Sequence, residues 1–156
     1  MSMTAELISV GTELLLGNIV NTNAAFLAQE CAKLGLSVYY QTTVGDNPGR
    51  LKAAVEQALE RSDVVILSGG LGPTQDDLTK EITAEAFGMK LVEDDHTRER
   101  IQAYFDARGT KKIAENNWKQ AMVPEGAVVV DNDNGTAPGL ILEKDGKTAI
   151  LLPGPP

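Results

Sequence analysis

The residues best suited to chemistry lie in one glycine-rich segment, residues 68–79, which reads SGGLGPTQDDLT. Its three closely spaced glycines allow the backbone to approach a ligand and to turn N–H groups toward an anion. These glycines are Gly69, Gly70 and Gly72. The carboxylates of Asp76 and Asp77 supply the oxygen ligands that divalent cations prefer. The segment therefore predicts a site for a phosphate-containing ligand with a divalent metal, and the simpler alternative is a strand-to-helix turn whose aspartates cap the helix.

The same segment matches neither of the two common phosphate-binding fingerprints. No Gly-Lys-Ser or Gly-Lys-Thr follows the glycines, so it is not a P-loop. Gln75 stands where a dinucleotide-binding fingerprint has its third glycine. Ser68, Thr74 and Thr79 supply hydroxyl groups along the segment, and we expect them to contribute to phosphate binding.

Two further loops carry polar residues that are expected to face the same crevice. Asp46 follows a strand rich in β-branched and aromatic residues, and it can orient a water, act as a general base or bind a metal, or else only cap the next helix. Thr12 and Glu13 follow the first strand and have the same two interpretations. Gly135 and Thr136, in a turn-rich stretch, are expected to form another wall.

The elements that position these loops alternate in type along the first half. Strands are expected at residues 5–10, 37–44 and 64–67, and helices at residues 22–33 and from Pro48 onward. Asn21 or Thr22 and Asn47 are the expected N-caps. A βαβαβ succession predicts a mostly parallel sheet with helices on both faces, and ligands bind beyond the carboxyl ends of such strands.

The second half is expected to be more helical and to end in strands. Helical segments are predicted at residues 78–87, 94–107 and around 113–121, and strands at 128–130, 140–143 and 148–152. The dipeptide Asp145-Gly146 predicts a β-hairpin between the last two strands. The chain is thus expected to form one three-layer α/β/α domain over residues 1–156 with a C-terminal hairpin.

Composition excludes several classes of function. The net charge of −8 argues against nucleic-acid and anionic membrane partners. One cysteine and one histidine exclude a disulfide framework and paired-histidine zinc motifs. No apolar run is long enough to span a bilayer and no signal peptide is visible, so a cytoplasmic location is expected.

Six motifs, in order along the chain, resemble those of the CinA family of competence/damage-inducible proteins. They cover residues 11–17, 21–23, 44–47, 69–79, 135–139 and 152–155. The region resembled is the family's N-terminal module, whose fold is that of the molybdopterin-binding MogA/MoaB proteins. The resemblance also implies that the chain is the front part of a longer protein and assembles as a homo-oligomer, a dimer or a trimer.

The resemblance implies ADP-ribose pyrophosphatase activity, which gives AMP and ribose 5-phosphate and depends on Mg²⁺ or Co²⁺ and on K⁺. Asp46 and Asp77 are then the expected catalytic residues, and Asp76 with Asp77 the expected metal ligands. Nothing in the chain resembles the family's C-terminal deamidase domain. The alternatives are a non-catalytic molybdopterin- or nucleotide-binding module and a molybdopterin adenylyltransferase.

One difference from the MogA/MoaB loop favours a metal-bridged ligand. Those proteins have a threonine where this chain has Leu71, and an arginine where it has Asp76. A carboxylate in place of a guanidinium reverses the local charge, so an anion would be held through a cation rather than directly.

Overall fold

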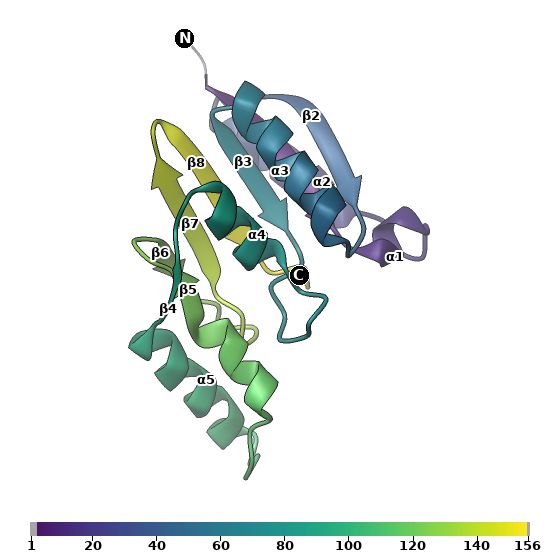
Figure 1. Ribbon diagram of the computed structural model, residues 1–156. Coiled ribbons are helices and arrows are strands. Elements are labelled where there is room, and N and C mark those ends of the chain that lie inside the picture. The colour runs from purple at the N-terminus through teal and green to yellow at the C-terminus, as the bar shows by residue number, and fades with distance from the viewer. Residues whose placement is uncertain (1–2, 156) are drawn as a thin grey trace.

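The computed structural model describes residues 3–155, and its centre is a six-stranded sheet in the order β2-β1-β3-β8-β7-β6 (Figure 1). Four strands run parallel: β1 (Thr4–Val10), β2 (Ser37–Val44), β3 (Val64–Ser68) and β8 (Lys147–Leu152). Two strands continue the sheet in the antiparallel sense, namely β7 (Gly139–Lys144) and β6 (Val128–Val130). The predicted mostly parallel sheet with a C-terminal hairpin is confirmed.

Helices cover both faces of the sheet and complete the expected three layers. α2 (Thr22–Lys33) covers one face, where Cys31 packs with Leu7 and Ile66. α3 (Pro48–Arg61) and α4 (Thr79–Ala86) cover the other face (Figure 1). The two faces receive alternate residues of each strand, as the two-residue period of a β-strand requires. Both faces are apolar, which is typical of a parallel sheet between helices.

Short-range signals begin and end these elements as the sequence predicts. The side chain of Asn21 accepts a hydrogen bond from Ala24 N–H, and that of Asn47 accepts one from Arg50 N–H, so both asparagines are N-caps. Asp145 and Gly146 have φ angles of 52° and 78°, the left-handed conformations of a tight hairpin turn.

A smaller unit lies beside the carboxyl ends of the parallel strands. It consists of α5 (Asp95–Ala107), the 3₁₀ helix η1 (Glu115–Ala121) and a two-stranded antiparallel sheet of β4 (Leu91–Glu93) and β5 (Met122–Pro124) (Figure 1). The prediction of a helical segment around 113–121 is thus corrected to a 3₁₀ helix. The sequence did not indicate β4, β5 or the one-turn helix α1 (Thr12–Leu15), because elements of three or four residues carry too little periodicity.

The start of α4 differs from the expected one. The helix begins at Thr79 with Leu78 as its N-cap, and no side chain caps it. The alternative interpretation of Asp76 and Asp77 as helix caps is therefore wrong. Within residues 3–155, no helix is long and apolar enough to cross a membrane.

Candidate ligand-binding cavity

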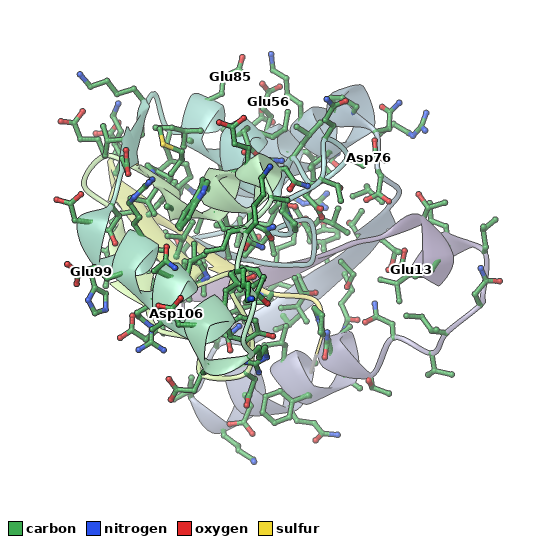
Figure 2. The ribbon with its side chains drawn as sticks, turned by 90° about the horizontal axis from the view of Figure 1, so that it is seen from below. Glu13, Glu56, Asp76, Glu85, Glu99 and Asp106 are labelled. Atoms are coloured by element: carbon green, nitrogen blue, oxygen red, sulfur yellow. The ribbon has the colours of Figure 1, made fainter. Side chains whose placement is uncertain are left out.

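A cavity of about 650 Å³ lies at the carboxyl end of the parallel strands. Its walls come from the loops that follow β1, β2 and β3, from residues 132–137 and from residues 153–155. Figure 2 looks onto this end of the molecule, with Glu13 and Asp76 on one side and Asp106 of α5 on the other. Three loops predicted to share one crevice do meet there, because parallel strands end at the same edge of a sheet.

Most of the predicted site residues line this cavity. They are Glu13, Asp46, Ser68, Gly69, Gly70, Gly72, Asp77, Gly135 and Thr136. Four others, Thr12, Thr74, Asp76 and Thr79, are not part of its lining. The structure thus brings Asp46 and Asp77 to one cavity beside the glycine loop.

Glycine is required at two positions of the loop that follows β3. Gly69 and Gly70 have φ angles of 95° and 72°, where side chains are strained. A Cβ on Gly69 would collide with the carbonyl oxygen of Val10, and one on Gly70 with the hydroxyl of Thr79. The loop therefore lies directly against β1 and α4, and Leu71 points into the larger core.

Asp77 is oriented within the loop by Thr74. The Thr74 backbone N–H donates to Asp77 Oδ2 at 3.1 Å, and the Thr74 hydroxyl donates to the same oxygen at 2.6 Å. Thr74 thus positions a carboxylate of the cavity wall.

Asp46 is held in a similar way by Thr12. The Asp46 N–H donates to Thr12 Oγ1 at 3.1 Å, and the Thr12 hydroxyl donates to Asp46 Oδ2 at 3.3 Å. These bonds join the loop after β2 to the start of α1. Thr12 therefore orients Asp46, while the neighbouring Glu13 lines the cavity itself.

Asp76 and Thr79 lie away from the cavity for opposite reasons. Asp76 is exposed to solvent, whereas Thr79 is fully buried behind the loop. Within residues 3–155 no three His, Cys, Asp or Glu side chains cluster as a metal cage would require. The carboxylates that remain in the cavity wall are Glu13, Asp46 and Asp77.

Two lysines, which sequence reasoning missed, support the glycine loop from behind. Lys119 of η1 donates to the carbonyl oxygens of Thr74, at 2.7 Å, and of Asp77. Lys80 donates to the carbonyl oxygen of Lys119 at 2.6 Å. Burial lowers the pKa of Lys80 to about 8, and this effect exceeds the opposing attraction of Glu81. No local sequence pattern indicated Lys119, because its contacts with Thr74 and Asp77 join residues that are far apart in the sequence.

Gln120 was also missed, although it lines the cavity. Its side chain is 4% exposed, and within residues 3–155 its Oε1 atom has no hydrogen-bond partner. A lone glutamine in a short polar segment carries no signal in a sequence. Only the placement of η1 beside the loop brings it to the cavity wall.

Comparison with known proteins finds relatives along almost the whole chain. The family model described as a probable molybdopterin binding domain matches residues 6–156. A competence-damage inducible protein of Caldicellulosiruptor bescii is 61% identical over 99% of this chain, and a CinA-like protein of Dictyoglomus turgidum is 60% identical over 99%. The chain spans only 37% of the length of each of these two relatives.

Solved structures agree with the fold. The protein CinA of Thermoplasma acidophilum, whose function is given as unknown, is 38% identical with a TM-score of 0.88. The match covers 98% of this chain and 89% of that one. The molybdopterin biosynthesis Mog protein of Mycobacterium ulcerans has a TM-score of 0.64 at 19% identity, covering 99% of this chain and 86% of its own. This second similarity concerns the fold alone.

Proposed function

This chain belongs to the family of the probable molybdopterin binding domain, and we propose that its cavity binds a nucleotide diphosphate-sugar such as ADP-ribose and hydrolyses the pyrophosphate bond. One observation carries the proposal: the glycine loop and the carboxylates of Asp46, Asp77 and Glu13 line the same cavity. Its volume of about 650 Å³ suits a small-molecule ligand.

The loop after β3 supplies the phosphate-binding part of the proposed site. Backbone N–H groups at Gly70 and Gly72 would bind the phosphate oxygens, since no side chain intervenes between backbone and ligand. The N–H of Gly69, which the sequence also predicted as a phosphate donor, instead donates to the carbonyl oxygen of Leu152 at 3.0 Å. Thr74 and Lys119 hold this loop in place through the bonds described above. Rigid donors aimed at the phosphates stabilise the charge that develops during phosphoryl transfer.

Asp46 is assigned the role of orienting and deprotonating the attacking water. Its Oδ2 atom accepts a hydrogen bond from the Thr12 hydroxyl, and this bond fixes the orientation of the carboxylate. The water oxygen bonds to one phosphorus, the bridging P–O bond breaks, and the bridging oxygen leaves on the other phosphate. The water proton passes to Asp46, and the products are AMP and ribose 5-phosphate.

The donor set fits a divalent ion held largely by the ligand. Mg²⁺ commonly binds through one or two carboxylates together with substrate phosphates and waters. We assign Asp77 to this ion because its side chain lines the cavity. Asp76 belongs to the same loop but is not part of the cavity lining. Bound there, the ion would neutralise charge on the phosphates.

The test is to incubate the chain with ADP-ribose, Mg²⁺ and K⁺ and to measure AMP. Replacing Asp46 by Asn should lower the rate by at least about 100-fold, the usual contribution of a general base. Asp106→Asn, an exposed carboxylate on α5, is the matched control and should retain the wild-type rate. Asp77→Asn should lose activity while Asp76→Asn keeps it. Equal rates for Asp46→Asn and the control, or no AMP above a chelator blank, would contradict the proposal.

A second function is favoured by the family description itself. A module that binds molybdopterin or a nucleotide without turnover would show saturable heat on titration and no product. Formation of adenylylated molybdopterin from the nucleotide would instead identify an adenylyltransferase.

A further inference from the structure

A second pocket, of about 250 Å³, lies between α5 and the loop of residues 131–138, and the proposed hydrolysis does not use it. Four residues line both this pocket and the main cavity, namely Tyr104, Asn132, Gly135 and Thr136. The two therefore adjoin, on the side of the molecule that carries α5 and lies away from Glu13 (Figure 2). Sites for whole small molecules commonly span about 300–1,000 Å³. The second pocket therefore suits one part of a ligand whose remainder occupies the main cavity.

The loop that forms one wall of the second pocket is attached to α5 by charged side chains. Nε2 of His96 lies 3.0 and 3.1 Å from the two carboxylate oxygens of Asp131. Nη2 of Arg100 donates to Asp133 Oδ1 at 2.6 Å. The polar groups of this wall are thus held by a helix, and such fixed positions are what recognition of a ligand requires.

The charged side chains of the pocket retain hydrogen-bonding capacity of both kinds. Among residues 3–155, the bonds and ion pairs of Arg100 use its Nη2 and Nε atoms, which leaves Nη1 as a donor. The bond to Asp133 uses Oδ1 alone, so Oδ2 remains an acceptor. A hydroxyl group both donates and accepts, so a donor beside an acceptor matches the neighbouring hydroxyls of a sugar.

Charge and shape argue against the two other parts of a nucleotide diphosphate-sugar. The pocket is lined by two carboxylates, Asp131 and Asp133, and by one cation, Arg100, so its net negative charge repels a phosphate. A flat base stacks on an aromatic face, but the guanidinium of Arg108 already covers one face of Tyr104, at 3.5 Å from the ring centroid. A neutral ring with several hydroxyls therefore fits this lining better than a phosphate or a base.

We propose that the second pocket binds the sugar ring that follows the diphosphate of the ligand. Neighbouring hydroxyls of this ring donate to Asp133 and accept from Arg100. The inference rests on the proposed function in taking the ligand to be a nucleotide diphosphate-sugar. The pocket then determines which sugars the site accepts, while the glycine loop binds the diphosphate that all such ligands share.

The test fills the second pocket without touching the main cavity. Ala103 is exposed and lines the second pocket but not the main cavity, so Ala103→Leu occupies part of the space proposed for the sugar. Ala107→Leu is the matched control, because Ala107 lies one turn further along α5, is equally exposed and lines neither. Leucine is a good helix former, so both variants should melt near the wild-type temperature.

Calorimetry with Mg²⁺ compares two ligands whose methylene bridge prevents hydrolysis. These are α,β-methylene ADP-ribose and α,β-methylene ADP, which lacks the sugar. Ala103→Leu should weaken binding of the first by about tenfold and leave the second unchanged, and Ala107→Leu should change neither. Equal weakening of both would assign the pocket to the nucleoside and overturn the proposal. Unchanged binding of both, or no binding of the sugar-bearing analogue by the wild type, would overturn it too.

A second variant removes hydrogen bonding instead of space. The Asp133 side chain is 90% exposed, so Asp133→Ala deletes an acceptor at little risk to the fold. It should weaken binding of α,β-methylene ADP-ribose alone. An equal effect on both analogues, or none on either, would contradict the role of Asp133 in holding the sugar.

The outcome is distinguishable from that of the hydrolysis assay. If the wild type forms AMP from ADP-ribose while Ala103→Leu binds both analogues as the wild type does, the sugar pocket alone is overturned. Selective weakening of the sugar-bearing analogue by Ala103→Leu, without AMP formation by the wild type, supports the pocket and contradicts the hydrolase.

Discussion

The two ends of the parallel sheet differ in how fully their buried polar groups are hydrogen-bonded. At the amino end, Glu6 is 1% exposed and accepts from Arg61 Nε at 2.9 Å, from Arg61 Nη2 at 2.7 Å and from the Ser62 hydroxyl at 2.9 Å. This hydrogen bonding to Glu6 raises the pKa of Arg61. Nearby, the N–H and hydroxyl of Thr4 donate to Asp63 and lower the pKa of that carboxyl.

At the carboxyl end, some buried polar atoms lack such compensation. Among residues 3–155, the buried side-chain oxygens that lack a partner are Thr79 Oγ1, Glu81 Oε2 and Gln120 Oε1, and all lie on α4 and η1. Burial lowers the pKa of Lys80 in the same region. The comparison teaches that saturated polar groups at one end stabilise the fold, whereas the other end retains unused hydrogen-bonding capacity on the two elements that pack against the glycine loop.

The largest effect is expected when the ion pair at the amino end of the sheet is broken. Arg61→Met leaves the buried Glu6 carboxylate without its cation, and we expect the unfolding equilibrium constant to increase on the order of a thousandfold. Urea unfolding measures it. Lys33→Met, which removes an exposed partner of Glu30 at 2.9 Å, is the control and should cost less than about 1 kcal/mol. Equal losses for the two variants would mean that the amino end is not stabilised by its pairing.

The second prediction concerns the pH dependence of stability that Lys80 causes at the carboxyl end of the sheet. Lys80 titrates near pH 8 when folded and near 10.4 when unfolded, so the unfolded state binds more protons between these values. Stability contributed by this group therefore rises with pH across that window and is lowest below pH 8. Relative to Lys80→Met, the wild type should gain up to about 3 kcal/mol between pH 7.5 and 10.5. A stability difference independent of pH would show that Lys80 keeps an ordinary pKa.

The smallest effect compares two buried threonines. Thr79→Val removes a hydroxyl without a partner among the described residues and should change stability by less than about 0.5 kcal/mol. Thr97→Val removes a hydroxyl that donates to Asp94 at 2.6 Å and should cost about 1 kcal/mol. Urea unfolding of both variants checks the difference. A loss at Thr79 as large as that at Thr97 would indicate that its hydroxyl is satisfied after all.

Much of the fold could be predicted because local physics specifies it. Asn21 and Asn47 cap their helices through bonds to residues three positions away, and Asp145-Gly146 adopts the turn that this dipeptide favours. β4 and β5 could not be predicted, since Leu91–Glu93 and Met122–Pro124 become strands only by pairing across about thirty residues of chain. Lys119 could not be predicted for the same kind of reason, since it contacts Asp77 and Thr74 across 42 and 45 residues of chain.

The sequence by itself determined that a glycine loop and several carboxylates would follow parallel strands, because such strands end at one edge. It could not decide between Asp76 and Asp77, which are adjacent residues of one type. Only the tertiary structure separates them, since Thr74 and Lys119 hold the turn so that Asp77 lines the cavity and Asp76 faces solvent. Residue type determines which chemistry is possible, and long-range packing determines which of two identical side chains reaches the cavity.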